Sequence, residues 1–369
     1  MYNSLIWQGI IMTYLDFEKE IEQLDKNLDA LKNPYESEGI SSINQDKITD
    51  LQSTIDKKII EIYSNLNSWQ KTKVARHEKR PRSDYYIKNI FTNFELISGD
   101  RYFAEDESVI TGFAKLDKKS VLVIGQEKGY DTESRIKRNF GMMRPEGYRK
   151  CMRLMKIADK FNIPIISFID TPGAYPGKGA EERGQAEAIA SSIDCCLSLN
   201  VPTISIIIGE GGSGGAIALA TSNKVLMLEH SIYSVISPEG CASILWKDVS
   251  KSNEAAEAMK ITAQDLFKFN IIDEIIKEPV GGAHRDPVGC ANSIKSSLLK
   301  YLEFYNNRND INIIADRREK FMKIGKDLPA DISFGKFNKE EIIQMSKNKK
   351  IILISFLIIT ILGLLFYLS

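Results

Sequence analysis

The chain has 369 residues, 43% hydrophobic and 27% charged, and its 49 Lys and Arg residues balance its 49 Asp and Glu residues. This length is enough for one large α/β domain with a helical appendage, and a net charge of zero gives no support for a nucleic-acid partner. Five cysteines are scattered without C-x-x-C spacing, which favours reduced thiols over a disulfide framework or a zinc site, so we expect no metal in this chain.

The N-terminal part of the chain is predicted to be helical. Residues 1–11 are short and uncharged and lack the basic start of a signal peptide, so we expect the native start at Met12. Apolar residues then recur every three or four positions over 17–31 and again over 48–69, a pattern typical of an αα-hairpin. We assign residues 14–97 to an N-terminal helical region whose hairpin binds a partner.

Downstream, apolar β-branched runs alternate with amphipathic stretches. This alternation predicts a mostly parallel sheet with crossover helices. We assign residues 98–305 to this domain and 306–350 to a C-terminal extension. The expected elements are a helix over 85–94, strands over 109–116, 120–124 and 163–169, helices from Pro145 and over 181–200, strands over 203–208, 225–228 and 232–236, and helices from Pro238 and over 254–259, 263–269 and 288–305.

The C-terminal run over residues 351–368 is apolar without a break and follows Lys347, Lys349 and Lys350. As a helix it would span about 27 Å, close to the roughly 30 Å of a bilayer core. The run therefore predicts a membrane-spanning helix that would tether the rest of the chain on the cytoplasmic side. A plainer alternative is a different, membrane-inserted protein joined to this one by fusion or a frame error.

The most informative stretch is residues 201–220, VPTISIIIGEGGSGGAIALA. An apolar strand leads into a glycine turn and a small-residue helix, with Ser213 expected at the N-cap and Gly214 and Gly215 in the first turn. Backbone N–H groups there have no intrahelical acceptor and carry the positive end of the helix dipole. A second glycine turn, over residues 170–177, follows a neighbouring strand and is expected at the same edge of the sheet.

The residues alone leave four uses of this corner open. A phosphate site is one, although the stretch lacks the Lys-Ser/Thr ending of a P-loop and the spacing of a dinucleotide fingerprint. Residues 211–215 match G-x-S-x-G, which would make Ser213 a hydrolase nucleophile. The glycines could also merely let the helix and strand pack closely, as in a scaffold without chemistry. The fourth use is an oxyanion hole built from backbone N–H groups.

Seven longer motifs occur in order between about Tyr14 and about Phe321: LDFEKEIEQL, ARHEKRPR, NFGMMRPEGYRK, FIDTPGAYPGKGAEERGQ, GEGGSGGAIA, YSVISPEGCASILWK and GGAHRDP. Together they resemble the carboxyltransferase alpha subunit of multi-subunit acetyl-CoA carboxylase of the bacterial and plastid type. The resemblance implies a crotonase-like α/β fold, a spiral of ββα units. The family has neither residues like 1–11 nor the hydrophobic tail, so the resemblance leaves open whether these ends belong to the native protein.

The resemblance also implies an activity and partners. The family works as an α2β2 carboxyltransferase with a beta subunit, beside biotin carboxylase and a biotin carboxyl carrier protein, in the cytoplasm. Carboxybiotin on the carrier donates its carboxyl group to acetyl-CoA, giving malonyl-CoA for fatty-acid synthesis. The zinc ribbon of the family belongs to the beta subunit, which agrees with the missing cysteine pairs here.

By the same resemblance, Gly214 and Gly215 match the family's oxyanion pair and face the biotin ureido oxygen. The argument from the helix start reaches the same two residues. Glycine is expected there because a Cβ would take the place of the ligand oxygen or tilt the amides. Glu210 is expected to be a loop or interface carboxylate rather than a base. The remaining residues expected to bind the cofactor are Gly173, Ala174, Tyr175, Gly211 and Gly212.

Overall fold

A computed structural model describes residues 13–32, 45–308 and 310–325. Eight strands of these residues form one sheet: β1 (Thr92–Leu96), β2 (Val109–Leu116), β3 (Lys119–Gln126), β4 (Ile165–Thr171), β5 (Thr203–Gly212), β6 (Lys224–Leu228), β7 (Ile232–Ser234) and β8 (Glu274–Ile276). Their order is β1-β2-β3-β4-β5-β6-β8, and β7 pairs with β5. The pairs β1–β2 and β2–β3 are antiparallel and all the others are parallel, which confirms the predicted α/β class.

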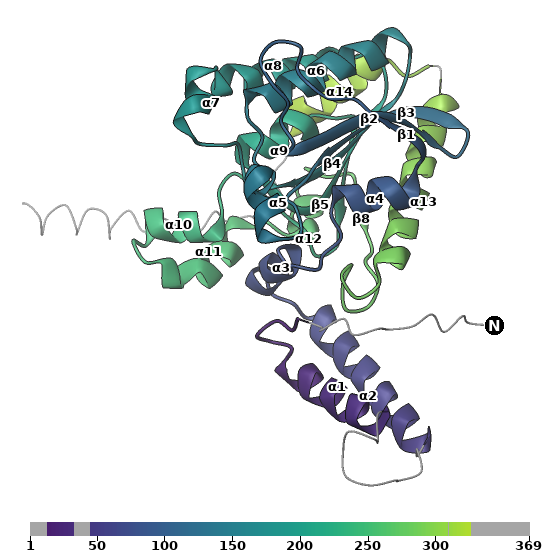
Figure 1. Cartoon of the computed structure of the whole chain (residues 1–369), viewed down its shortest axis with the longest axis vertical. Helices are drawn as coiled ribbons and strands as arrows, with labels where there is room; N and C mark the ends of the chain where they lie inside the picture. The colour runs from purple at the N-terminus through teal and green to yellow at the C-terminus, as the bar shows by residue number, and fades with distance from the viewer. Residues whose placement is uncertain (1–12, 33–44, 309, 326–369) are drawn as a thin grey trace, which may run out of the picture. The chain divides into compact units, whose positions relative to one another are not determined.

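The helices described are α1 (Lys19–Lys32), α2 (Gln45–Ser64), α3 (Ser68–Ala75), α4 (Ser83–Ile90), α5 (Thr132–Lys137), α6 (Pro145–Lys160), α7 (Lys178–Glu182), α8 (Gln185–Ser198), α9 (Ser213–Ala220), α10 (Pro238–Leu245), α11 (Ser252–Met259), α12 (Ala263–Lys268), α13 (Pro287–Asn306) and α14 (Ile313–Lys323). The unit β2–β3–α6 is followed by β4–α8, β5–α9 and β6–β7–α10. Strands and helices thus alternate along the chain (Figure 1), and β2–β3–α6 and β6–β7–α10 follow the predicted ββα order.

Two hydrophobic cores lie on opposite faces of the sheet. Residues of α6, α8 and α9 share one core with Ile207 of β5, and residues of α4 and α13 share the other with Ile206 and Ile208. The alternation along β5 reflects the two-residue period of a strand. Both faces of β5 are therefore covered, which explains its unbroken apolar sequence.

Several elements differ from the sequence prediction. The helix expected over 181–200 is broken into α7 and α8 at Gly184, whose φ of 81° is left-handed. The helix expected over 85–94 ends at Ile90, and the chain continues directly into β1. Helix α14 lies in the stretch assigned to a linker, and the three-residue strand β8 is too short to give a periodic signal.

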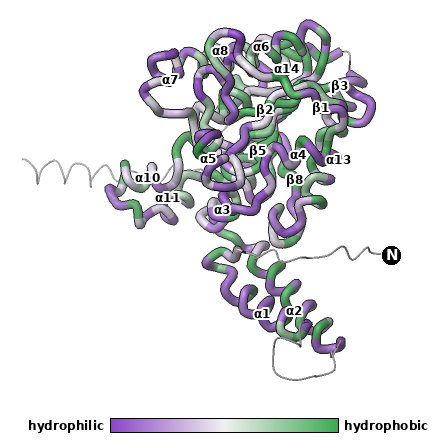
Figure 2. Tube along the Cα trace, in the orientation of Figure 1, coloured by the Kyte–Doolittle hydropathy of each residue, from purple (hydrophilic) through white to green (hydrophobic). Residues whose placement is uncertain are grey.

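The predicted αα-hairpin is confirmed as α1 and α2. Their apolar positions, including Ile21 and Ile55, form a core of their own, and most other positions of the two helices are hydrophilic (Figure 2). Glu18 anchors the hairpin because its Oε1 accepts hydrogen bonds from Tyr63 Oη at 3.0 Å and from Arg285 Nη2 at 2.9 Å. This carboxylate is fully buried, so the ion pair ties the hairpin to the loop before α13.

The predicted membrane-spanning run over 351–368 and the N-terminal residues 1–11 lie outside the described residues. Within the described part of the chain, no helix combines the length and the apolarity that crossing a bilayer requires.

Helix α14 has one buried residue, Arg317, which is 0% exposed. Its guanidinium donates to the carbonyl oxygens of Cys196 at 2.6 Å, Leu199 at 2.9 Å and Val201 at 3.0 Å. It also donates to Oδ1 of Asn223 at 2.6 Å. Arg317 therefore satisfies the backbone of the loop that leads from α8 into β5.

We predict that Arg317→Leu lowers the free energy of unfolding by about 3 kcal/mol or more, because it leaves several buried carbonyl groups without donors. Urea denaturation measures the change. Arg318→Leu is the matched control, since it makes the same substitution at the next, exposed position and should shift stability by no more than about 0.5 kcal/mol. Equal losses in the two variants would contradict the assigned role of Arg317.

All three histidines of the chain gather around Tyr63. The ring of Tyr63 lies 5.6 Å from that of His230 and 6.4 Å from that of His284, and His284 stacks on His77 at 4.0 Å. Burial lowers the pKa of each imidazole. For His284, burial, then repulsion from His77 when it is protonated, and then the positive charges of Arg80 and Arg285 lower the pKa to about 2. The cluster is therefore neutral in the folded protein at pH 7.

This cluster predicts a loss of stability in mild acid. Because the folded pKa values lie below the unfolded value, their contribution is fully present above about pH 6.5 and is lost as the pH falls. Each histidine that stays neutral should cost about 1.4 kcal/mol of unfolding free energy per pH unit below about 6.5. Urea denaturation between pH 7.5 and 5 measures the slope, and His284→Phe, which keeps a ring against His77, should make it shallower. An unchanged slope in that variant would contradict the prediction.

Candidate functional site

The two glycine turns lie side by side at the carboxyl ends of β4 and β5, which are parallel neighbours. The pairing runs in register to Ile169 and Ile207, and the next pair is Thr171 with Gly211. One residue of β4 therefore faces three residues of β5 at this point. Such a bulge bends the strand and leaves backbone groups without ladder partners.

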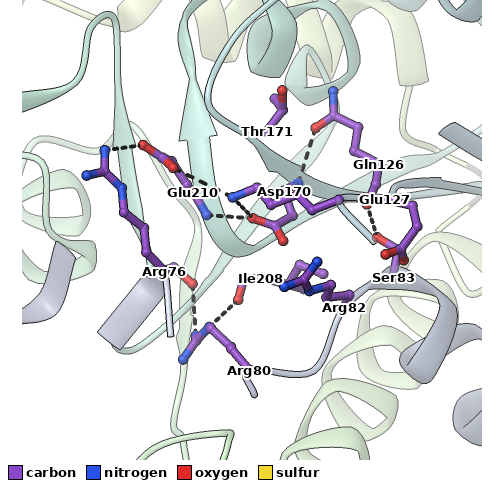
Figure 3. Close-up of polar contacts among 12 residues, drawn as sticks. Arg76, Arg80, Arg82, Ser83, Gln126, Glu127, Asp170, Thr171, Ile208 and Glu210 are labelled. Atoms are coloured by element: carbon purple, nitrogen blue, oxygen red, sulfur yellow. Dashed lines mark hydrogen bonds and ion pairs between the residues drawn. The ribbon is translucent and has the colours of Figure 1, made fainter. Parts of the chain in front are cut away.

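The side chain of Asp170 fills the bulge. Its Oδ1 accepts a hydrogen bond from the backbone N–H of Glu210 at 3.0 Å and lies 2.7 Å from Nζ of Lys128 (Figure 3). A Cβ on Gly209 would lie only 2.5 Å from the same oxygen. Glycine at this position is thus required by the close approach of the carboxylate.

Arg80 provides a hydrogen-bond donor to the backbone of the bulge on β5. Its Nε donates to the carbonyl oxygen of Ile208 at 2.7 Å (Figure 3), and its Nη1 and Nη2 donate to Glu278 at 2.9 and 2.6 Å. Burial alone would raise the pKa of Glu278, but Arg80 and then His230 hold that pKa at about 2. The guanidinium and the carboxylate are thus both charged in the core.

Glu210 is held by two cations. Nη2 of Arg76 donates to its Oε1 at 2.6 Å, and Nζ of Lys128 lies 3.6 Å from its Oε2. Burial would raise the pKa of Glu210, but Lys128 and Arg76 outweigh burial and lower it. A carboxylate that is kept ionised and paired is a poor proton acceptor, so these contacts favour a structural role for Glu210 over proton transfer.

Helix α9 begins one residue earlier than predicted. Its N-cap is Gly212, in an extended conformation with φ −101° and ψ 126°, and no side chain caps the helix. The assignment of Ser213 as the N-cap is wrong because the strand conformation ends at Gly212 and α9 already includes Ser213, although the φ of 50° at Ser213 is left-handed. Gly214 and Gly215 remain in the first turn, where N–H groups have no intrahelical acceptor.

The two turns pack backbone against backbone. A Cβ on Gly215 would lie 2.5 Å from the carbonyl carbon and oxygen of Gly173. A Cβ on Gly212 would lie 2.2 Å from the carbonyl oxygen of Pro172, in the same turn as Gly173. A Cβ on Gly214 would meet Ile189 at an ordinary 3.5 Å. Close packing of the turns is thus a reason for glycine at Gly215 in addition to the expected room for a ligand oxygen.

The remaining predicted site residues have different neighbours. Ala174 lies with Gly173 against Gly215, since its backbone nitrogen would be 2.9 Å from a Cβ there. A Cβ on Gly173 itself would meet no atom within 4 Å, so open space adjoins this turn. Tyr175 and Gly211 have other neighbours. The ring of Tyr175 lies 4.7 Å from the guanidinium of Arg144, and Gly211 pairs with Tyr233 of β7.

The sequence analysis missed Gln126, which is 0% exposed at the end of β3. Its Nε2 donates to the carbonyl oxygen of Gly215 at 2.7 Å, and its Oε1 accepts from the backbone N–H of Asp170 at 3.2 Å (Figure 3). Ser83 Oγ donates to the backbone carbonyl of Gln126 at 2.6 Å. The sequence did offer one signal for Gln126, because it is a polar residue at the end of an apolar strand, at the edge of the sheet where both turns lie.

The structure provides no base for Ser213. Among the described residues, its hydroxyl has no hydrogen-bond partner and the three histidines surround Tyr63 instead. A serine nucleophile needs a base within hydrogen-bond reach, so the G-x-S-x-G match does not correspond to an assembled triad.

Comparisons with known proteins agree with this description. The family model described as acetyl co-enzyme A carboxylase carboxyltransferase-like matches residues 14–325. The acetyl-coenzyme A carboxylase carboxyl transferase subunit alpha of Pelagibacter ubique is 62% identical over 313 residues, which cover 85% of this chain and 85% of that protein. The protein of the same name from Nitrobacter winogradskyi is 53% identical over 316 residues, covering 86% and 98%.

A solved structure of the transcarboxylase 12S hexamer with hydrolysed methylmalonyl-coenzyme A has a TM-score of 0.49 at 19% identity, covering 62% of this chain and 44% of that one. The family match spans the hairpin, the sheet and both glycine turns. The chain belongs to the family of carboxyltransferase alpha subunits of acetyl-coenzyme A carboxylase.

Proposed function

We propose that this chain supplies one half of a site that transfers a carboxyl group from carboxybiotin to acetyl-CoA, giving malonyl-CoA. The backbone N–H groups of Gly214 and Gly215 are the donors for the biotin ureido oxygen. The observation that carries this proposal is the start of α9, where two N–H groups have no intrahelical acceptors and Gly215 packs against the turn at Gly173. The open space beside Gly173 gives a ligand access to these donors.

Backbone donors suit this reaction because negative charge develops on oxygen. Carboxybiotin, carried on a partner protein, supplies the carboxyl group. Donors that are held in place before the reaction stabilise such charge without reorganising during it. Contact between Gly215 and Gly173 holds the donors in place. The positive end of the α9 dipole further stabilises negative charge at this point. The chain itself needs no nucleophile for this role, in keeping with the unpartnered hydroxyl of Ser213.

The proposal includes partners. The relatives are named as alpha subunits, and we infer that a beta subunit in an α2β2 assembly supplies the thioester site and a second oxyanion hole. Biotin carboxylase and a biotin carboxyl carrier protein would complete the enzyme. The α1–α2 hairpin, in which most positions outside its core are hydrophilic, is proposed as a partner-binding region.

Two substitutions at Gly214 isolate the N–H donor. Gly214→Pro removes it at a first-turn position where proline is tolerated, and kcat for malonyl-CoA formation should fall about 100- to 1,000-fold. Gly214→Ala keeps the donor and adds only an ordinary contact with Ile189, so its loss should stay below about tenfold. Size-exclusion chromatography with the beta subunit verifies assembly of both. Equal turnover by the assembled proline and alanine variants would remove Gly214 from the site.

The hydrolase alternative is tested at Ser213. We predict that Ser213→Ala retains most of the carboxyl transfer in the same assay, because neither the hydroxyl nor a capping bond is used. A serine-directed phosphonate should leave the wild-type chain unlabelled. Labelling of Ser213, or a loss as large as that of Gly214→Pro, would favour the hydrolase.

A further inference from the structure

We propose that Gln126 is a positioning residue for carboxyl transfer, whose side-chain amide sets the place of the first turn of α9 relative to the end of β4. The inference rests on the proposed function of Gly214 and Gly215 as donors. Gln126 does not need to touch the substrate for this role. It acts through the backbone of Gly215 and of Asp170, the two groups that its amide joins.

The orientation of the amide is determined by its partners. The backbone N–H of Asp170 can only donate, and the carbonyl oxygen of Gly215 can only accept, so Oε1 must face the first and Nε2 the second. Both contacts are buried, and the backbone of Gln126 is itself held in β3 and by Ser83. The amide is thus a fixed bridge with no freedom to exchange its two ends.

The bridge completes a circuit around the site. From Gly215 it passes through Gln126 to the backbone of Asp170, and the carboxylate of Asp170 then accepts the N–H of Glu210 in β5. Strand β5 leads back through the glycine turn to Gly215. Each step of this circuit fixes a backbone group, so the N–H donors of the first turn cannot shift without breaking a buried hydrogen bond.

The opposite end of α9 offers a matched comparison. There Ser205 Oγ donates to the carbonyl oxygen of Leu219 at 2.8 Å. This bond is also a buried side-chain donor to a carbonyl of the same helix, but it lies at the end away from the donor turn. A loss of stability alone should therefore follow from either bond, whereas a loss of turnover should follow from the Gln126 bond alone.

The test compares Gln126→Met with Ser205→Ala in the complex of the full chain with the beta subunit. Methionine keeps the length of glutamine but neither hydrogen bond. We expect kcat for malonyl-CoA formation to fall about 100-fold, the effect of a displacement near 1 Å in a preorganised site, with KM for acetyl-CoA unchanged. Ser205→Ala should keep kcat within about twofold. Wild-type kcat in assembled Gln126→Met, or equal losses in both variants, would overturn the proposal.

Gln126→Glu gives a second readout that a purely structural role would not move. One carboxylate oxygen still accepts from Asp170, while the other repels the carbonyl oxygen of Gly215 until it is protonated and can donate. Burial favours the protonated form. The ratio of variant to wild-type kcat should therefore rise as the pH falls from 8 to 6, whereas a flat ratio would contradict positioning through this bond. This readout remains decisive if the methionine variant does not fold.

The outcomes at Gln126 and at Gly214 are separable. Loss of activity in Gly214→Pro together with normal Gln126→Met would overturn only the positioning role. Normal activity in both variants would overturn the donor assignment as well. A wild-type complex that forms no malonyl-CoA would reject the proposed function before any variant is compared.

Discussion

The carboxylate of Asp170 is the contact on which the geometry of the site depends. Strands β4 and β5 leave their common register at this residue, where one position of β4 faces three of β5. The backbone N–H of Glu210 would otherwise be unpaired in a dry region, which costs about 1–3 kcal/mol for a buried donor. By accepting it, Asp170 lets β5 carry its glycine turn onto the turn at Gly173. The register shift thus brings the two glycine turns into close contact.

Burying Asp170 and Glu210 side by side requires compensation, because like charges in a region of low dielectric repel strongly. Lys128 lies next to both carboxylates and Arg76 pairs with Glu210. Arg76 follows α3 directly and also binds Glu239 at the start of α10 at 2.6 Å. Ion pairs therefore join the segment after the hairpin to the sheet domain, although the sequence analysis assigned this segment to a separate N-terminal region.

The order of elements, the parallel sheet and the shared edge of the two turns could be predicted because they follow from local patterns. The first-turn position of Gly214 and Gly215 was predictable for the same reason. The packing reason for glycine at Gly215 was not, since it depends on a contact with Gly173, 42 residues away in the sequence. Gln126 and Arg317 were missed because a polar residue at the end of an apolar strand, or an arginine in a charged stretch, does not reveal its distant partners. These partners lie 89 and up to 121 residues away.

Arg317 also has a consequence for a chain that is still being synthesised. Its acceptors in the loop before β5 leave the ribosome 116 to 121 residues ahead of it. Until α14 emerges, those carbonyl groups lack the guanidinium as their donor, although Thr203 at the start of β5 can already pair with Ile165 of β4. The loop that leads from α8 into β5 therefore acquires its final hydrogen bonds only after nearly the whole described chain has been synthesised.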